Sequence, residues 1–204
     1  MNLKQVKSRY NRFSKFFDLL ESPVEWLVFS KWRERYLKNL RGKVLEIGVG
    51  TGKNLPYFNY KKINLTGIDL SPGMLEKAKE KARENKYKVD LKLGNAERLS
   101  FQDNSFDWVV CTFLLCSVPN PEKAIKEMKR VVKKRGKIIF LEHVRSRNKL
   151  ILLWQKIHNP ITRFLLGFNV DRDTIKTIKK SGLKIKSEKN LALIDVFKKL
   201  EVSK

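Results

Sequence analysis

The chain has 204 residues, and its 45 Lys and Arg residues against 21 Asp and Glu residues give a formal net charge of +24 at pH 7. A hydrophobic content of 42% excludes a wholly disordered chain, and no apolar run reaches the roughly 18 residues of a membrane-spanning helix. The length suits one domain, which we expect to cover residues 1–204, and the charge indicates either an anionic partner, such as nucleic acid or a membrane surface, or a lysine-rich genome.

The chain start and the two cysteines bear on the cellular compartment. Residues 1–7 lack the apolar stretch and the small-residue cleavage site of a secretory signal. Cys111 and Cys116 lie in an apolar stretch, are too few for a disulfide scaffold and are joined by no second Cys pair or His cluster that would make a metal site. We therefore expect buried thiols, no bound metal and a cytoplasmic protein.

Residues 1–42 are predicted to be helical. Aromatic and aliphatic residues, Phe13, Phe17 and Trp32 among them, recur there at the three- to four-residue spacing of an amphipathic helix. Ser22 and Pro23 are predicted to separate two helices, because Pro is tolerated at a first helical position.

From residue 43 the pattern alternates between strands and helices. The expected strands are residues 44–47, 64–69, 89–93, 106–111 and 137–142, followed by a terminal pair at 183–186 and 192–197. The expected helices are residues 71–85, 121–132 and 174–181, the first capped by Ser71. Such alternation predicts an α/β fold, a parallel sheet with helices on both faces.

One segment interrupts the alternation. Residues 148–169 are strongly apolar with scattered cations. We expect them to form, with the N-terminal helices, a cap over one end of the sheet. The predicted organisation is therefore a helical cap at 1–42, a core at 43–143, a helical insert at 144–171, and a final helix and strand pair at 172–204.

A glycine-rich loop follows the first strand. The run at residues 46–52 reads Glu-Ile-Gly-Val-Gly-Thr-Gly, and Asp69 stands at the end of the second strand, where an acidic residue of a nucleotide-binding sheet accepts hydrogen bonds from ribose hydroxyls. Gly52 comes one residue early for a dinucleotide fingerprint, and Lys53-Asn54 lacks the hydroxyl of a P-loop. The loop thus favours a ligand with a ribose and an amino acid over one with a pyrophosphate.

These motifs resemble the class I S-adenosylmethionine-dependent methyltransferases. The runs at residues 44–52, 66–75, 94–107 and 130–137 match four of the family's motifs in order. The resemblance covers about residues 43–143 and implies a Rossmann-like fold with a mostly parallel seven-stranded sheet.

The resemblance also implies a site for S-adenosylmethionine. Its cofactor-binding residues would be Tyr10, Glu46, Gly48, Val49, Gly50, Asp69, Leu70, Met74, Asn95, Ala96, Thr112 and Phe113. The backbone of residues 48–50 would pass beneath the methionine part, Asp69 would take both ribose hydroxyls, and Leu70 and Met74 would flank the adenine. Thr112 and Phe113 would line the methyl-transfer path.

Asn95, Tyr10 and Glu46 need separate comment, because each departs from the family's pattern or has more than one possible role. Asn95 stands where most members of the family carry aspartate, and its amide oxygen can still accept from the adenine amino group while the Ala96 N–H reads the adenine edge. Tyr10 would close over the cofactor from an N-terminal helix, in which the family's usual second tyrosine is Phe17. Glu46 either binds the cofactor through water or holds the glycine loop.

His143 follows the fifth strand on the side where ligands of parallel sheets bind. It is the candidate catalytic residue, a general base near the methyl acceptor, and the alternative is a histidine that anchors the next loop.

Weaker similarities narrow the family. Residues 118–124, 140–144, the Trp154 segment and residues 171–174 resemble a branch with membrane-associated thiol methyltransferases, near phosphatidylethanolamine and quinone-biosynthesis methyltransferases. The branch implies a small or lipid-like acceptor, namely a thiol, an aminophospholipid or a quinone precursor. We expect contact with an anionic membrane through residues 1–40 and 148–168, at the inner face of the membrane.

Two other hypotheses remain open. An RNA methyltransferase would use the basic surface, but residues 118–122, Val-Pro-Asn-Pro-Glu, lack the Asn/Asp-Pro-Pro-aromatic motif used on base amines. A non-catalytic binding module is disfavoured by the intact cofactor motifs. Lysines interleaved with glutamates along the helices also fit a compositional bias of the kind found in thermophiles. The sequence does not indicate the oligomeric state.

Overall fold

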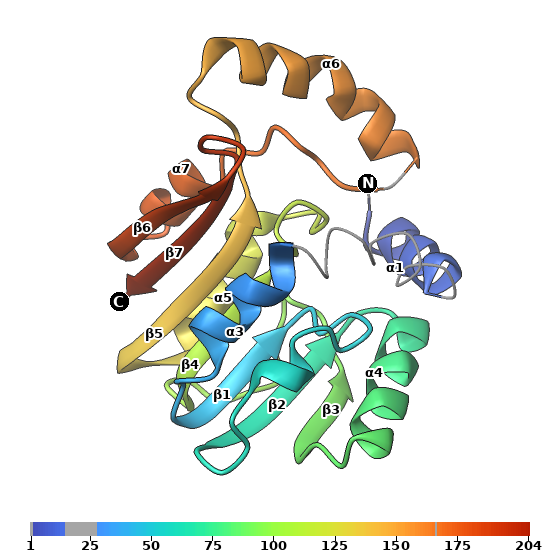
Figure 1. The fold of residues 1–204 in the computed structure, drawn as a ribbon, viewed down its shortest axis with the longest axis vertical. Coiled ribbons are helices and arrows are strands. Elements are labelled where there is room, and N and C mark those ends of the chain that lie inside the picture. The colour runs from blue at the N-terminus through green and yellow to red at the C-terminus, as the bar shows by residue number, and fades with distance from the viewer. Residues whose placement is uncertain (1, 15–27, 166) are drawn as a thin grey trace.

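The computed structural model describes residues 2–14, 28–165 and 167–204, built around one seven-stranded sheet (Figure 1). In sheet order the strands are β3 (Val89–Leu93), β2 (Ile63–Asp69), β1 (Gly42–Ile47), β4 (Phe106–Thr112), β5 (Val132–His143), β7 (Phe197–Ser203) and β6 (Lys184–Ala192). Strands β1 to β5 run parallel, and β7 runs antiparallel to both β5 and β6. The predicted α/β fold with a mostly parallel sheet is confirmed.

Helices lie on both faces of this sheet and at one end of the molecule (Figure 1). They are α1 (Leu3–Phe13), α3 (Ser30–Leu37), α4 (Pro72–Glu84), α5 (Pro121–Val131), α6 (Lys149–Leu165) and α7 (Thr174–Lys180), with a short 3-10 turn, η2 (Leu55–Tyr57). The Ser71 hydroxyl accepts from the Met74 N–H and caps α4 as predicted, and Asn120 and Asp173 cap α5 and α7 in the same way.

Alternation along the central strands gives the sheet two hydrophobic layers. Leu45 and Ile47 of β1 pack in the layer that contains the apolar face of α5, whereas Val44 packs in the layer that contains α3 and α4. Strands buried on both faces are the expected consequence of helices on both sides.

The order of the strands reverses between β1 and β4. These two strands are parallel neighbours, with Ile47 opposite Cys111, and the chain leaves them toward opposite sides of the sheet. The loops that follow them, residues 48–52 and 113–117, therefore meet at the carboxyl edge of the sheet. Ligands of open parallel sheets bind at this point.

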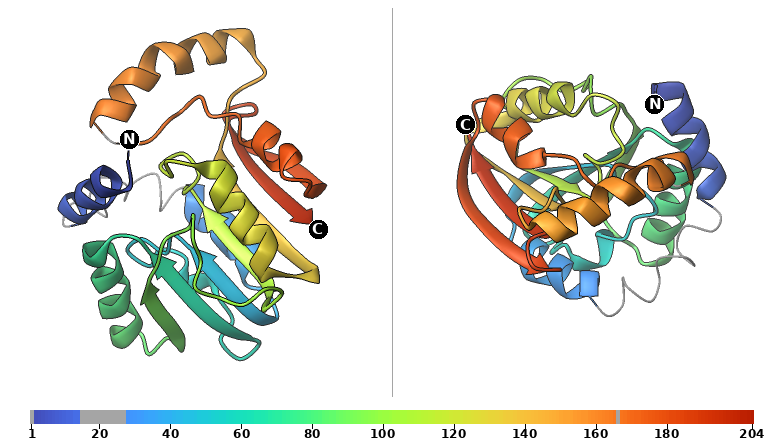
Figure 2. Two further views of the ribbon diagram at one scale, coloured as in Figure 1. Left: turned by 180° about the vertical axis from the view of Figure 1, so that it is seen from behind. Right: turned by 90° about the horizontal axis from the view of Figure 1, so that it is seen from above.

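Helices α1 and α6 lie at the same end of the molecule as that edge (Figures 1 and 2). Arg9 of α1 donates to the Arg163 carbonyl of α6 at 2.8 Å, and Asn11 of α1 accepts from the Gly73 N–H of α4 at 2.7 Å. We call these two helices the cap. The predicted division of the chain into cap, core, insert and final segment remains a prediction. The predicted helix break at Ser22-Pro23 and the role of Phe17 lie outside the described residues.

The terminal strand pair is displaced from the prediction. The sequence predicts strands at residues 183–186 and 192–197, but β6 extends to Ala192 and β7 begins only at Phe197. Leu193 and Ile194 have positive φ angles in the intervening turn, and the Asp195 carboxylate accepts from the Ser146 hydroxyl and from the Arg147 N–H. Residues 193–196 therefore form a turn, although their apolar composition is typical of a strand.

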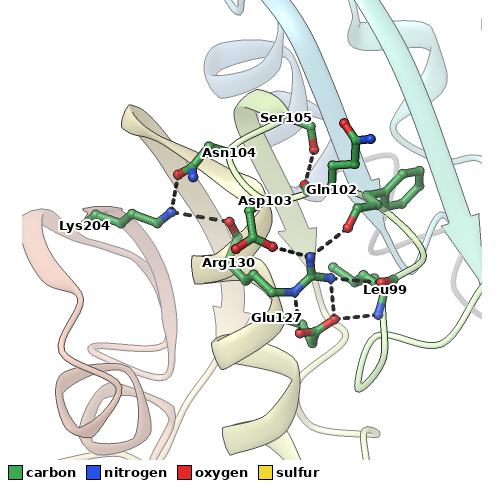
Figure 3. Close-up of polar contacts among 9 residues, drawn as sticks. Leu99, Gln102, Asp103, Asn104, Ser105, Glu127, Arg130 and Lys204 are labelled. Atoms are coloured by element: carbon green, nitrogen blue, oxygen red, sulfur yellow. Dashed lines mark hydrogen bonds and ion pairs between the residues drawn. The ribbon is translucent and has the colours of Figure 1, made fainter.

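A guanidinium fixes the connection between β3 and β4 onto α5 (Figure 3). Arg130 donates to the carbonyls of Leu99 and Phe101, at 2.9 and 2.7 Å, and to the Asp103 carboxylate at 2.8 Å. It also forms a bidentate pair with Glu127, whose carboxylate in turn accepts from the Leu99 N–H. Five donors in a rigid plane are needed for this geometry, which an ammonium group cannot reproduce.

We predict that Arg130→Lys lowers the free energy of unfolding by about 1–3 kcal/mol, because at least two of these partners lose their donor. Chemical denaturation monitored by circular dichroism measures the change. Arg83→Lys is the matched control, since Arg83 makes one exposed ion pair at 3.7 Å with Glu76 and its replacement is expected to cost less than about 0.5 kcal/mol. Equal effects of the two substitutions would contradict this account.

Candidate active site

A cavity of about 570 Å³ lies between the cap and the carboxyl edge of the sheet. Nearly all the residues that the resemblance implies line it: Tyr10, Gly48, Val49, Gly50, Asp69, Leu70, Met74, Asn95, Ala96, Thr112, Phe113 and His143. Glu46 is the exception. The structure thus gathers residues from six separate segments of the chain around one cavity.

The glycine loop presents its backbone to this cavity. Gly48 and Gly50 have φ angles of 77° and 56°, a region that L side chains rarely adopt. A Cβ on Gly48 would lie 2.8 Å from the Leu114 side chain, whereas a Cβ on Gly50 would meet no atom within 4 Å. The missing side chain at Gly50 therefore leaves room for a ligand against the backbone.

Asp69 connects the loop to the end of β2. Its carboxylate oxygens accept from the Gly50 N–H at 2.9 Å and from the Ser71 N–H at 2.8 Å. Burial raises the pKa of Asp69, and these backbone donors oppose that rise. The Leu70 N–H is a third backbone donor to this carboxylate, and the acceptor position that remains can take a ligand hydroxyl.

Asn95 and Ala96 lie in a tight turn after β3. The Asn95 side-chain oxygen accepts from the Glu97 N–H at 2.9 Å, and Glu97 accepts from the Asn120 N–H at 2.7 Å. The amide oxygen expected to meet an adenine amino group thus already has one partner. Its remaining lone pair is available to the ligand.

Tyr10 brings α1 to the edge of the cavity. Its hydroxyl lies 2.5 Å from the Ser117 hydroxyl, in the loop after β4. Leu3 and Val6 of the same helix also line the cavity, so the apolar side of α1 faces inward. Tyr10 thus lies at the cavity, and its closing over the cofactor remains a prediction.

Glu46 is buried behind the glycine loop. One carboxylate oxygen accepts from the Asn54 side-chain amide at 2.7 Å, and the other has no hydrogen-bond partner among the described residues. Burial raises the pKa of Glu46 to about 8. This position fits a role in holding the loop, and direct contact with a cofactor remains a prediction.

Arg33 of α3 is a cavity residue that sequence reasoning missed. Its buried guanidinium donates to the Asn54 side-chain oxygen, lies 3.5 Å from the Thr112 hydroxyl and stands 5.6 Å from the centre of the Phe113 ring. Asn54 joins this group to Glu46. The segment around Arg33 is rich in exposed charges, so only the tertiary fold distinguishes this cation from its neighbours.

His143 lines the cavity among aromatic rings. Its ring centroid is 5.6 Å from that of Phe168 and 6.4 Å from that of Phe197, and it has no hydrogen-bond partner among the described residues. Burial, with the nearby Arg172 guanidinium, lowers the pKa of His143 to about 4. The imidazole is therefore neutral at pH 7, the same causes disfavour its protonated form, and its role as a base remains a prediction.

Glu142, the second residue that sequence reasoning missed, positions the loop after β4. One carboxylate oxygen accepts from the N–H groups of Leu114 and Leu115, at 2.9 and 3.1 Å, while the other has no partner among the described residues. Burial raises the pKa of Glu142 to about 7. Arg172 donates to the carbonyls of Leu115 and Val118, so the loop is held by two ionisable side chains, Glu142 and Arg172.

The cysteines have the predicted environment. Cys111 and Cys116 are both free and buried, and burial raises the pKa of each thiol, to about 12 for Cys116. Thiols of this kind are poor nucleophiles at neutral pH. Within residues 2–14, 28–165 and 167–204, no group of three or more His, Cys, Asp or Glu side chains could hold a metal ion.

The fold and the cavity together define a Rossmann-like enzyme with a site for a nucleoside bearing an amino-acid group. A family model described as "Methyltransferase domain" matches residues 45–140. The phosphatidylethanolamine N-methyltransferase of Cereibacter sphaeroides is 37% identical over 150 residues, 70% of each chain. The demethylmenaquinone methyltransferase of Lactobacillus johnsonii is 33% identical over 181 residues, 82% of this chain and 74% of that protein.

A third relative and a solved structure agree with these matches. The thiol S-methyltransferase TMT1B of Rattus norvegicus is 33% identical over 164 residues, 74% of this chain and 67% of that protein. A crystal structure from Thermotoga maritima, described as a possible histamine N-methyltransferase, matches 94% of this chain and 98% of its own with a TM-score of 0.69 at 24% identity, which shows the fold. The chain belongs to the class I S-adenosylmethionine-dependent methyltransferases.

Its cofactor is S-adenosylmethionine, and the residues of the cavity fit it. The open space at Gly50 suits a ligand lying against the backbone, and Asp69 can accept from a ribose hydroxyl. Leu70 and Met74 supply apolar walls near Asn95 and Ala96.

We predict that Gly50→Ala weakens binding of the demethylated cofactor at least tenfold by calorimetry, because the methyl group would occupy ligand space. The positive φ angle adds a destabilisation of about 1–2 kcal/mol. Gly182→Ala is the matched control, since Gly182 has a φ of 75° and a Cβ there would meet only the flexible end of Lys129. Equal loss of affinity in both variants would show that backbone strain, and not the cavity, causes the loss.

We predict that Glu142→Gln removes one component of the pH dependence of stability. Between pH 4.5 and about 7 the folded wild-type chain keeps a proton on Glu142 that the unfolded chain has lost, so the free energy of unfolding falls as pH rises, by on the order of 3 kcal/mol. The opposite contribution of His143, between pH 4 and 6.5, is common to both proteins.

The measurement is urea denaturation of the wild type and of Glu142→Gln across pH 4.5 to 8. The difference between the two unfolding free energies is expected to shrink or reverse in favour of the variant as pH rises. A constant difference over this range would contradict a proton held on Glu142.

Proposed function

We propose that this methyltransferase acts on a small or lipid-like acceptor with a substantial apolar part, taken up at a membrane surface. The observation that carries the proposal is the wall of the cavity beyond Thr112. That wall is built from Phe29, Phe168, Val170, Leu193, Val196 and Phe197. Such a wall favours an acceptor whose hydrocarbon leaves water on binding.

The names of the relatives support this acceptor class. They describe methylation of phosphatidylethanolamine, of demethylmenaquinone and of thiols. The reacting atoms differ, being nitrogen, carbon and sulfur, but the first two acceptors carry long hydrocarbon chains. An apolar acceptor is therefore the property that the cavity and these names have in common.

The side chains divide the work of the reaction between them. S-adenosylmethionine, when bound, supplies an electrophilic methyl group attached to a sulfonium. Residues 48–50, Asp69, Leu70, Met74, Asn95 and Ala96 would hold it, while Thr112 and Phe113 would line the path of the methyl group. The cap excludes water, and orientation of two reactants in a closed site supplies up to about 7–11 kcal/mol of the barrier reduction.

His143 is the group that can move a proton. A thiolate or a neutral amine needs little help from a base, whereas a quinol carbon or a hydroxyl must lose a proton as it is methylated. The neutral imidazole faces the acceptor side of the cavity and can receive that proton.

The net charge of +24 favours a second candidate, an RNA methyltransferase. A nucleotide would have to bring its phosphates near the apolar wall described above. Salt-dependent RNA binding alone would indicate phosphate contact only, so the test of this candidate is saturable methylation of defined RNA.

A labelled-methyl transfer screen tests the proposal. Thiols, phosphatidylethanolamine, a demethylated quinol and tRNA are each offered with S-adenosylmethionine, and we expect turnover with one of the first three. Saturable methylation of tRNA, with none of the apolar acceptors used, would overturn it.

His143→Gln is then assayed with the acceptor found. We expect kcat to fall by on the order of 100-fold if the acceptor is a quinol carbon or a hydroxyl, with loss of the acidic limb of the pH profile, since general-base catalysis contributes that much. For a thiol or an amine we expect a change of less than about threefold. If His143→Gln binds a quinol acceptor tightly and methylates it at the wild-type rate, His143 is not the general base.

A further inference from the structure

Helix α6 exposes an apolar face to solvent. Leu150, Leu153, Ile157, Ile161, Phe164 and Leu165 are each more than half exposed, and Leu150 and Phe164 reach 78% and 77%. Their spacings of three, four and seven residues place them on one side of the helix, which we call the α6 outer face. Contiguous exposed apolar side chains of this kind mark a site of interaction.

The opposite side of α6 is firmly seated. The buried Gln155 amide donates to the carbonyls of Val144 and Val170, at 2.9 and 2.8 Å, and its oxygen accepts from the Ser146 N–H at 2.9 Å. Because these bonds fix the rotation of the helix about its axis, the α6 outer face points away from the rest of the protein. Figure 1 and the left view of Figure 2 show α6 across one end of the molecule.

A row of cations runs beside the outer face. Lys149, Lys156 and Arg163 are exposed and spaced seven residues apart, so they share one flank of the helix. Residues 149–165 contain no Asp or Glu. An apolar face bordered by cations alone complements an anionic lipid surface, in which the apolar side chains enter the acyl region and the cations meet the headgroups.

The α6 outer face adjoins the mouth of the cavity. Trp154 of α6 and Leu193 of the β6–β7 turn both line the cavity and are 56% and 65% exposed. Ile194 beside Leu193 is also mostly exposed, and the Asp195 carboxylate bonds to Ser146 and Arg147 where the chain leads into α6. Apolar side chains therefore flank the cavity mouth on two elements.

We infer that the α6 outer face, with Leu193 and Ile194, docks onto an anionic membrane surface and opens the cavity toward the lipid. Helix α1 adds the exposed cations Lys4 and Arg12, while its Leu3 and Val6 line the cavity. No helix among the described residues is long and apolar enough to cross a membrane. Docking rests on the outer face itself, and only the lipid as source of the acceptor rests on the proposed function.

Vesicle sedimentation of the full chain tests the inference. Vesicles of phosphatidylcholine with and without 30 mol% phosphatidylglycerol serve as probes, and we expect binding only to the anionic ones. Lys149→Gln/Lys156→Gln/Arg163→Gln is expected to weaken this partitioning by on the order of 100-fold, from about 1 kcal/mol for each cation near the surface. Leu153→Gln/Ile157→Gln is expected to weaken it at least tenfold while leaving the charge intact.

The matched control has the same charge change on another helix. Lys176→Gln/Lys179→Gln/Lys180→Gln alters exposed lysines of α7 and should change partitioning less than about fivefold. An equal loss in the α7 and α6 charge variants would mean attraction by net charge alone and would overturn the proposal. Wild-type binding by Leu153→Gln/Ile157→Gln would overturn it as well.

Two further readouts separate the alternatives. Light scattering of the wild type and of Leu153→Gln/Ile157→Gln detects a dimer that the substitutions dissociate, and such a dimer without vesicle binding would overturn the proposal in favour of a self-interface. Loss of tRNA binding in the α6 variants, again without vesicle binding, would overturn it in favour of RNA.

Calorimetry with the demethylated cofactor shows whether each variant retains a folded cofactor site. Vesicle binding without methylation of any apolar acceptor would defeat the proposed function and leave docking intact. Methylation of a dispersed apolar acceptor without vesicle binding would overturn docking, and with it uptake at a membrane surface, while leaving the proposed acceptor class intact.

Discussion

The parallel pairing of β1 with β4 is the constraint on which the rest of the site depends. Because the chain leaves these two strands toward opposite faces of the sheet, the described helices that follow them do not cover the gap between their carboxyl ends. The glycine loop and residues 113–117 meet there, and the cap closes over them. The hydrophobic layers on both faces hold the pairing in place, so the site is positioned by the core of the fold and not by its surface loops.

Buried polar groups convert that gap into a shaped site. Glu46 and Asn54 lie behind the first loop, with Arg33 and Thr112 in the same network, and Glu142 holds the second loop by its backbone N–H groups. Burying such groups is costly unless they are hydrogen-bonded. Their presence beneath two short loops indicates that rigidity of the cofactor end is obtained at some expense in stability, while the end at which we propose that the acceptor binds is lined by apolar side chains.

The sequence predicts those parts of the molecule that depend on local pattern. The glycine loop, Asp69 and the Ser71 cap each rest on residues that are close in sequence, and the strands β1 to β5 follow from apolar runs between turn signals. Arg33 and Glu142 could not be found in this way, because a buried cation and a buried carboxylate look like ordinary surface charges until tertiary contacts enclose them. The segment at residues 192–197 was mispredicted for a related reason: its apolar composition favours a strand, and the contacts of Asp195 with residues 146–147 impose a turn.

The contacts of α1 have a consequence for the order of binding events. Tyr10 of α1 contacts Ser117 in the loop after β4, and Arg9 of α1 donates to the Arg163 carbonyl of α6. Any ligand that displaces α1 must break contacts with both walls of the cavity. The affinities at the cofactor end and at the acceptor end are then joined through one helix, and thermodynamic linkage requires that each influences the other by the same factor.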